Sequence, residues 1–201
     1  EPFGTPWLTH AGKKIRVLSS PVGTAPDLIQ ELMNKPSVKQ HSNQINTGTK
    51  KGRKLILSAS RVDYTKGNEE LLLAFERLLE SRKDLHGDVV LMLSCVAAAT
   101  GMKIYDETQR SIEEMAGRIN GRFSLIDWVP IRFSTRRIPY DEMIAWFTQA
   151  DICWITPLRD GLNLVAKEYA AARKEKGGVL VLSEFTGASV ILEGAVLTNP
   201  Y

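Results

Sequence analysis

The sequence is poor in cysteine and lacks any long apolar run, and each shortage excludes a class of protein. Its two cysteines, Cys95 and Cys153, both lie inside apolar runs, so they indicate small buried side chains and not a disulfide framework. No apolar stretch reaches the roughly 18 residues that a membrane-spanning helix requires, and no signal peptide opens the chain. We therefore expect a soluble, cytoplasmic protein with no membrane partner.

Charge and motif content exclude further classes. The chain has 26 basic and 23 acidic residues, and its longest basic block is "TKKGRK" at 49–54, which is too little for a nucleic-acid stripe. Its histidines, His10, His41 and His86, are scattered without a second ligand at metal spacing, and there is no D-x-D pair, so we predict no metal site. Neither G-x-G-x-x-G nor a Walker A loop is present, and we predict no cofactor.

The ends of the sequence indicate a piece of a longer protein. The chain starts at Glu1 in place of an initiator methionine, and it stops at "TNPY" directly after a strand-like "AVLT". With 201 residues and 43% hydrophobic composition it can bury one good core. We expect one full domain with an appendage from a neighbouring domain.

Apolar runs of strand length alternate with helical patterns along the chain. Most runs are rich in Val, Ile and Leu without clean alternation, which is typical of strands covered on both faces. The predicted strands are 14–20, 54–60, 89–97, 122–128, 151–156 and 178–183, with 195–198 as a possible seventh, and the predicted helices are 69–82, 105–119, 141–150 and 163–174. This order predicts an α/β fold with a Rossmann-like parallel sheet.

One polar segment interrupts this alternation. Residues 35–53 contain glycine and almost no large apolar side chain, which predicts a loop or linker. Before it, residues 1–34 form the tail of another domain and an interdomain segment, with a short helix at 26–34. After it, residues 54–201 form the main α/β unit. Within that unit, "GRINGRF" at 117–123 predicts a helix end and an Asn-Gly turn that leads into a strand.

The first candidate site follows the predicted strand 54–60. Arg61 and Lys66 lie in a short loop that ends at Gly67, where a helix begins. Two cations and the free N–H groups of a helix N-terminus can converge on one anion, and a diphosphate is the natural guest. The alternative is that both side chains are ordinary solvated loop cations, since exposed Lys and Arg are common.

The second candidate site is the stretch "TPLRDGLNLVAKEYAAAR" at 156–173. Pro157 ends a buried strand, Asp160 and Gly161 form a tight turn, and Asn163 can cap the following helix. The Asp160 carboxylate suits either backbone hydrogen bonds at the helix N-terminus or the hydroxyl groups of a sugar, and the residue types leave both interpretations open. A third loop, "SEFTGAS" at 183–189, follows the next strand and can face the same cleft.

Six motifs together resemble one enzyme family. The stretches "SRVDYTKG", "GRINGRF", "DWVPI", "TPLRDGLNLVAKEY", "VLVLSEFTGAS" and "LTNPY" occur in the order and spacing found in the nucleotide-binding C-terminal domain of the trehalose-6-phosphate synthases and glucosylglycerol-phosphate synthases. The resemblance covers about residues 21–201. It implies the C-terminal half of a GT-B glycosyltransferase, which transfers glucose from a nucleotide-glucose to a phosphorylated acceptor with retention and without a required metal.

The resemblance also implies a role for each matching residue. Arg61 and Lys66 would hold the donor diphosphate and stabilise the charge of the leaving group, and Asp160 would bind hydroxyls of the transferred glucose. The remaining site residues would shape the sugar pocket (Gly161, Leu162, Asn163), offer backbone amides to the diphosphate (Leu164, Val165) and accept from the ribose hydroxyls (Glu168).

Departures from the family pattern bear on the acceptor. Trehalose-6-phosphate synthases carry an arginine after the third strand that contacts the acceptor phosphate, whereas this chain reads "SCVAAATGMKIY" at 94–105, with alanines and Thr100 in that region. This segment resembles glucosylglycerol-phosphate synthases, which implies ADP-glucose as donor and glycerol 3-phosphate as acceptor. The alternatives are trehalose-6-phosphate synthesis from UDP-glucose and glucose 6-phosphate, and a nucleotide-sugar-binding module without catalysis.

The resemblance finally implies a missing partner. The N-terminal domain of the family supplies most acceptor-binding groups, and this chain contains only its tail. Half a cleft can bind a donor but cannot position an acceptor for attack. We therefore expect the isolated chain to be inactive.

Overall fold

A six-stranded parallel sheet forms the centre of the molecule. The structure, a computed structural model, describes residues 6–18, 20–48, 52–97 and 102–201. The sheet has the order β5-β4-β3-β6-β7-β8, and every pair in it is parallel. Its strands are β3 (Lys54–Arg61), β4 (Val89–Val96), β5 (Ile131–Ser134), β6 (Ile152–Ile155), β7 (Val179–Ser183) and β8 (Val196–Thr198).

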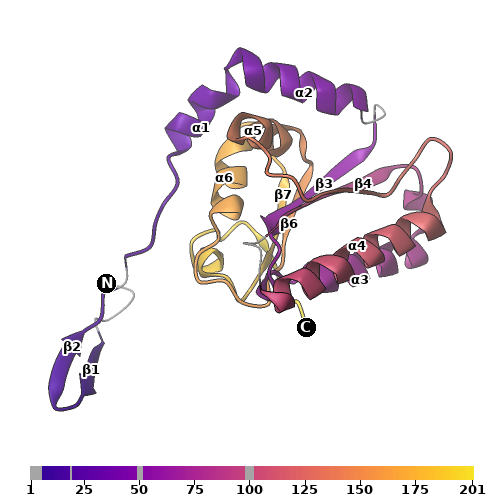
Figure 1. Cartoon of the computed structure of the whole chain (residues 1–201). Helices are drawn as coiled ribbons and strands as arrows, with labels where there is room; N and C mark the ends of the chain where they lie inside the picture. Colours follow the sequence, from indigo (N-terminus) through magenta and orange to yellow (C-terminus); the bar gives the residue numbers. More distant parts are fainter. Residues whose placement is uncertain (1–5, 19, 49–51, 98–101) are drawn as a thin grey trace.

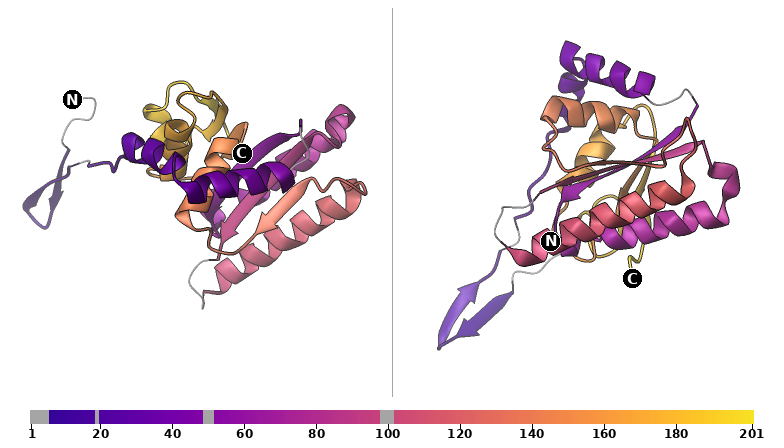
Figure 2. Two further views of the ribbon diagram at one scale, coloured as in Figure 1. Left: turned by 90° about the horizontal axis from the view of Figure 1, so that it is seen from above. Right: turned by 45° about the vertical axis from the view of Figure 1, so that its right-hand side comes forward.

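Helices cover both faces of this sheet, as the unbroken apolar runs predict. Helices α3 and α4 lie together on one face, and α5 and α6 lie on the other, where α1 and α2 pack over them (Figures 1 and 2). The helices are α1 (Pro26–Met33), α2 (Pro36–Gly48), α3 (Asn68–Ser81), α4 (Lys103–Phe123), α5 (Tyr140–Gln149) and α6 (Leu164–Ala172). Among the described residues no helix is both long and apolar enough to cross a membrane.

The core lies between the sheet, above all its neighbouring strands β3 and β4, and the helices on either side. Leu57 of β3, together with Leu91 and Leu93 of β4, has no exposed surface, and Phe75 of α3 and Phe147 of α5 close over them from opposite faces. Full burial of such side chains contributes about 1.5–3 kcal/mol each. Burial on both faces is the reason why these strands are continuously apolar.

The loop predicted for residues 35–53 is wrong over 36–48, because this stretch is the helix α2. Val38 and Ile45 lie seven residues apart, so they fall on one helical face, and both are buried in the common core. The Ser37 hydroxyl donates to the Asp141 carboxylate of α5 at 2.7 Å. Two buried side chains and tertiary hydrogen bonds therefore outweigh a weak helical sequence pattern.

The strand predicted at 122–128 is also wrong. Helix α4 continues through Gly121 to Phe123, and only an isolated antiparallel bridge joins Leu125 to Trp128. The fifth strand of the chain is instead Ile131–Ser134, which pairs with β4. Trp128 is buried and its indole N–H donates to the Val89 carbonyl at 2.7 Å, so its apolar character serves packing beneath the sheet edge and not strand pairing.

The N-terminal segment contains a hairpin and not the single strand that the sequence predicts. Strands β1 (Trp7–His10) and β2 (Lys13–Arg16) pair antiparallel, and the hairpin stands apart from the sheet in both views (Figures 1 and 2). Large apolar side chains on it, Trp7, Leu8 and Ile15, are 61%, 57% and 47% exposed. Helix α1, in contrast, buries Ile29 against the α/β unit.

The strand order creates a switch point between β3 and β6. From β3 the chain continues outward through β4 to β5, whereas from β6 it continues the opposite way through β7 to β8. From the carboxyl ends of these two neighbours the chain continues to helices on opposite faces of the sheet, and ligands bind at such a switch point in open α/β sheets. A small pocket lies here, lined by Lys66, Thr156 and Asn163 among others, and we call it the crevice. Lys66 follows β3 and Asp160 follows β6, so both candidate loops start at this crevice.

The two loops are docked on each other through their backbones. The Leu158 and Arg159 amides donate to the Thr65 carbonyl at 2.9 and 3.3 Å. Gly67 makes this approach possible, because its φ is +66° and a Cβ there would lie 2.3 Å from the Thr156 carbonyl oxygen. Only glycine satisfies both conditions.

We therefore expect Gly67→Ala to lower the free energy of unfolding by at least about 2 kcal/mol, because the left-handed backbone is strained and the two loops must separate. Urea titration of the chain followed by circular dichroism measures this change. Gly117→Ala is the matched control, since a Cβ at Gly117 within α4 meets no atom within 4 Å. That substitution should stabilise the chain by roughly 0.5–1 kcal/mol, and an equal loss in both variants would contradict the argument.

Candidate functional site

The loop after β3 is folded by its own aspartate. One Asp63 carboxylate oxygen accepts from the Thr65 amide at 2.9 Å and from the Thr65 hydroxyl at 2.8 Å. The Lys66 amide donates to the Asp63 carbonyl at 2.9 Å, which closes a single turn of 3₁₀ helix over Tyr64–Lys66. This turn fixes the point from which the Lys66 side chain leaves the backbone.

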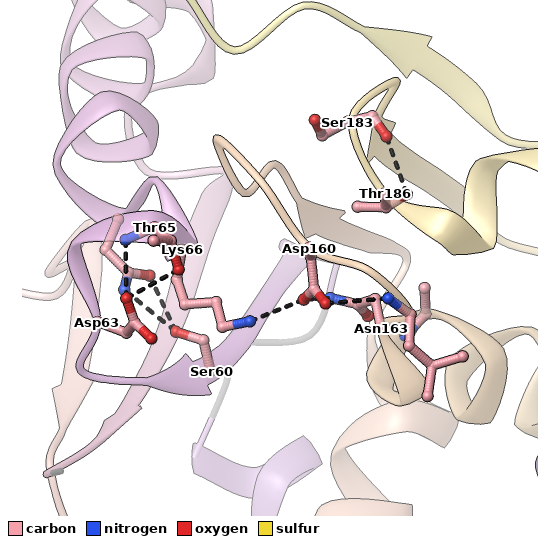
Figure 3. A network of polar contacts seen from close by, with 11 residues as sticks. Ser60, Asp63, Thr65, Lys66, Asp160, Asn163, Ser183 and Thr186 are labelled. Atoms are coloured by element: carbon pink, nitrogen blue, oxygen red, sulfur yellow. Dashed lines mark hydrogen bonds and ion pairs between the residues drawn. The ribbon is translucent and has the colours of Figure 1, made fainter. Parts of the chain in front are cut away.

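The Lys66 side chain extends across the crevice to Asp160 (Figure 3). Its ammonium nitrogen lies 2.8 Å from Asp160 Oδ2, and the two side chains are only 19% and 14% exposed. Asp160 Oδ2 also accepts from the Asn163 side-chain amide at 3.2 Å, and Oδ1 accepts from the Leu162 backbone N–H at 3.2 Å. Donors from both loops therefore hold the carboxylate in one orientation.

These contacts determine the charge state of Asp160. Burial raises the pKa of the carboxyl group, but the hydrogen bonds from Lys66 and the Leu162 N–H, with the charge of Lys66, outweigh burial and hold the pKa below its ordinary value. Asp160 is thus an anion at neutral pH. A charged lysine and a charged aspartate stand together at the mouth of the crevice, where they can contact a negative group and a set of hydroxyl groups respectively.

Asn163 prepares the N-terminus of α6 beside this pair. The residue adopts a positive φ of 63°, and its side-chain oxygen accepts from the Ala166 amide at 2.9 Å, as the sequence predicts for a helix cap. The amides of Leu164 and Val165 belong to the first helical turn and have no acceptor within the helix. Together with the helix dipole they favour an anion at this position.

The third predicted loop, 183–189, supports the site through its backbone. The Asp160 amide donates to the Phe185 carbonyl at 3.2 Å, and the Gly187 amide donates to the Asp160 carbonyl at 2.9 Å. A Cβ at Gly187 would lie 2.1 Å from the Gly161 carbonyl oxygen, so the approach requires glycine. Thr186 is buried and its hydroxyl donates to the Ser183 carbonyl at 2.9 Å, which gives it a structural role.

Glu168 lies further along α6, near the start of α5. It is half-buried, and its Oε1 accepts from the Tyr140 hydroxyl at 3.1 Å. Burial raises the pKa of Glu168, and the hydrogen bond from Tyr140 opposes that rise. Glu168 lies on the helix that Asn163 caps, about one and a half turns from that cap.

Arg61 and Glu168 are the charged residues of the predicted site that no hydrogen bond or ion pair among the described residues joins to Lys66 and Asp160. Arg61 is the last residue of β3, its side chain is exposed, and it makes no ion pair with any residue that the structure describes. Lys66, Asp160, Leu162 and Asn163 form the contact network. Among the described residues no three His, Cys, Asp or Glu side chains are grouped as metal ligands. Residues 98–101, which include Thr100 of the expected acceptor region, lie outside the described part of the chain.

Several residues that shape the site were not identified from the sequence. Asp63 and Thr65 form the turn under Lys66, and Asn68 at the start of α3 exchanges hydrogen bonds of 3.1 and 3.2 Å with the Ser60 hydroxyl. An aspartate two residues before a threonine is typical of an Asx turn, so this spacing could have indicated the turn formed by Asp63 and Thr65. No sequence signal connects Ser60 to Asn68 before the helix direction is known.

Comparison with known proteins identifies the family of the chain. The family model for Glycosyltransferase family 20 matches residues 3–201. A glucosylglycerol-phosphate synthase from Synechocystis sp. is 49% identical over the whole chain, which covers 40% of that relative, and one from Picosynechococcus sp. is 50% identical over 90% of the chain and 36% of the relative.

Trehalose-phosphate synthases are more distant in sequence and close in fold. The 56 kDa subunit of the UDP-forming α,α-trehalose-phosphate synthase of Saccharomyces cerevisiae is 37% identical over 96% of the chain and 39% of its own length. The crystal structure of an α,α-trehalose-phosphate synthase (UDP-forming) from Burkholderia xenovorans in complex with glucose-6-phosphate is 38% identical, with a TM-score of 0.92 over all of this chain and 44% of the other. Our chain thus spans about two fifths of the length of these relatives, and it belongs to glycosyltransferase family 20.

Proposed function

We propose that the whole protein transfers glucose from ADP-glucose to glycerol 3-phosphate, with retention and without a metal, and that this chain is its donor-binding part. The observation that carries the choice of acceptor is the identity of 49% and 50% with two glucosylglycerol-phosphate synthases, against 37% with a trehalose-phosphate synthase. The sequence "SCVAAATGMKIY" at 94–105 supports the same choice, because it lacks the arginine expected for a sugar-phosphate acceptor.

The donor diphosphate binds where cations and helix amides converge. Lys66 already projects into the crevice, and the N–H groups of Leu164 and Val165 open toward the same end of α6. As the glycosidic bond of the donor breaks, negative charge develops on the leaving diphosphate. Groups that are fixed before the reaction stabilise this charge without reorganising. Arg61 supplies a second cation from the adjacent strand end.

Asp160 binds hydroxyl groups of the transferred glucose. Its two oxygens receive donors from Lys66, Leu162 and Asn163, and an ionised carboxylate has about four acceptor positions, so room for a sugar hydroxyl is left. Because the Asp160 carboxylate is held in one orientation, the direction from which a sugar hydroxyl can donate to it is fixed. Gly161 adds no side chain at the turn and keeps the approach to Asp160 open, while Glu168 accepts from the ribose.

The hairpin β1–β2 connects this part to the domain that completes the cleft. Its Trp7, Leu8 and Ile15 are exposed in the part of the chain that the structure describes, and they fit the apolar surface of a second domain. We assign residues 1–34 to the tail of that domain and the interdomain segment, and residues 54–201 to the nucleotide-sugar-binding domain. Helix α2 packs on α5 and belongs with the latter domain. The acceptor binds between the two domains, and the chain alone is inactive.

Trehalose-6-phosphate synthesis is the second candidate, and the fold comparison favours it. The Burkholderia xenovorans protein, whose structure contains glucose-6-phosphate, superimposes on the entire chain with a TM-score of 0.92. The two activities share the same donor site, so the described contacts of Lys66 and Asp160 suit both.

A product assay distinguishes the two activities. The full-length enzyme is incubated with radiolabelled ADP-glucose or UDP-glucose and with glycerol 3-phosphate or glucose 6-phosphate. We expect glucosylglycerol phosphate as the main product, from ADP-glucose. Trehalose phosphate as the main product would contradict the proposal, and absence of any transfer would indicate a module that binds nucleotide sugars without catalysis.

Replacing Lys66 by alanine tests the anion site. We expect Lys66→Ala to weaken nucleotide-sugar binding or turnover of the full-length enzyme at least about tenfold, or about 1.4 kcal/mol. Because Asp160 then loses its buried partner, the variant should also be less stable. The matched control is Lys54→Ala, which removes an exposed lysine that lies 3.2 Å from Asp151 at the opposite end of β3. Equal affinities in both variants would make Lys66 an ordinary surface cation.

The pKa of Asp160 predicts how stability depends on pH. Its folded pKa lies below the unfolded value near 3.8, so the stabilisation by the ionised carboxylate is complete above that value and is lost as the pH falls through the folded pKa. The difference in unfolding free energy between wild type and Asp160→Asn should therefore be constant from pH 5 to 8, within about 0.5 kcal/mol, and narrow below about pH 4. A difference that grows as the pH falls would contradict the ion pair.

A further inference from the structure

The hydrogen bond between Tyr140 and Glu168 joins two helices that the chain separates widely. Tyr140 is the first residue of α5, and Glu168 lies in the middle of α6. The Tyr140 hydroxyl lies 3.1 Å from Glu168 Oε1, and the two helices are in contact. Among the described residues Tyr140 is the only hydrogen-bond partner of the Glu168 side chain.

The protonation states of the two groups make the direction of the bond definite. Burial and the charge of Glu168 raise the pKa of Tyr140 to about 12, so the phenol keeps its proton at neutral pH and donates. Glu168 is half-buried and accepts through Oε1. Oε2 has no donor among the described residues, so it can accept from a ligand.

We propose that Tyr140 is a positioning residue for the donor ribose: it holds Oε1 of Glu168 so that Oε2 accepts from a ribose hydroxyl of the nucleotide. This inference rests on the proposed function, in which Glu168 binds the ribose. A glutamate has three side-chain torsions, and fixing them on binding costs free energy. A glutamate that is already held in one conformation loses less conformational entropy when the nucleotide binds.

A purely structural role would be a tie between α5 and α6. Such a tie would affect folding, and through it would weaken every nucleotide ligand to the same extent. A positioning role makes a different prediction, because only ligands that carry ribose hydroxyls can use the orientation of Glu168. The ratio of the affinities for a ligand with ribose hydroxyls and one without them therefore distinguishes a positioning role from a structural one. A single affinity does not.

The experiment measures binding of ADP, and of its analogue that lacks both ribose hydroxyls, to the full-length enzyme by calorimetry. Wild type should bind ADP at least about tenfold more tightly than the analogue, as expected for hydrogen bonds to a charged group. Tyr140→Phe keeps the ring and removes the hydroxyl. It should reduce this ratio at least about threefold, mainly by weakening ADP, while the thermal midpoint stays close to that of wild type.

Two further variants make each outcome decisive. Glu168→Gln should reduce the ratio at least as much as Tyr140→Phe, and an unchanged ratio would refute the ribose role of Glu168 together with this inference. Ser81→Ala removes an exposed hydroxyl that donates to the Leu78 carbonyl at the C-terminal end of α3, and it should leave the ratio unchanged. If Glu168→Gln lowers the ratio but Tyr140→Phe keeps it, the ribose site stands and Tyr140 only ties the helices. An equal reduction of the ratio in Tyr140→Phe and Ser81→Ala would also overturn the inference.

Discussion

The ion pair between Lys66 and Asp160 is the interaction on which the arrangement of the crevice depends. The two residues are 94 positions apart in the chain, yet their charged groups lie 2.8 Å from each other in a half-closed environment. Removing one partner from such a pair leaves a charge in a poorly solvated place, which costs more than the pair contributes. The pair therefore holds the loops after β3 and β6 together. It also orients the Asp160 carboxylate, which accepts two further hydrogen bonds, from Leu162 and Asn163.

Glycine permits the close backbone contacts that this pair requires. Gly67 brings the first loop against Thr156, and Gly187 brings the third loop against Gly161. At both places a Cβ would overlap a carbonyl oxygen, so the spacing of the three loops is set by backbone contact before any side chain acts. These backbone contacts hold the three loops in place beside the N-terminus of α6.

The paired charges also bear on how a glycosyltransferase of this family meets its donor. In the free crevice Lys66 and Asp160 neutralise each other, which lowers the cost of keeping two charges partly out of water. Under the proposed function, the nucleotide sugar would bring a negative diphosphate for the lysine and hydroxyl donors for the aspartate, so each charge would gain a second partner without either side chain crossing the crevice. Glu168, tied to Tyr140 at 3.1 Å, is held in a similar way before the ligand arrives.

The sequence by itself determined the class of the fold and the loops in which the candidate site lies. Unbroken Val, Ile and Leu runs between amphipathic helices indicate a parallel sheet, and strand ends followed by Lys66, by Asp160 and by the Asn163 cap mark the junctions, because these signals are local in the chain. Only the tertiary structure decided the rest. Val38 and Ile45 are buried where α2 packs on α5, and Trp128 is buried with its indole N–H bonded to the Val89 carbonyl of β4. Whether Lys66 reaches Asp160, and Tyr140 reaches Glu168, depends on strand order and helix direction, which no stretch of sequence contains.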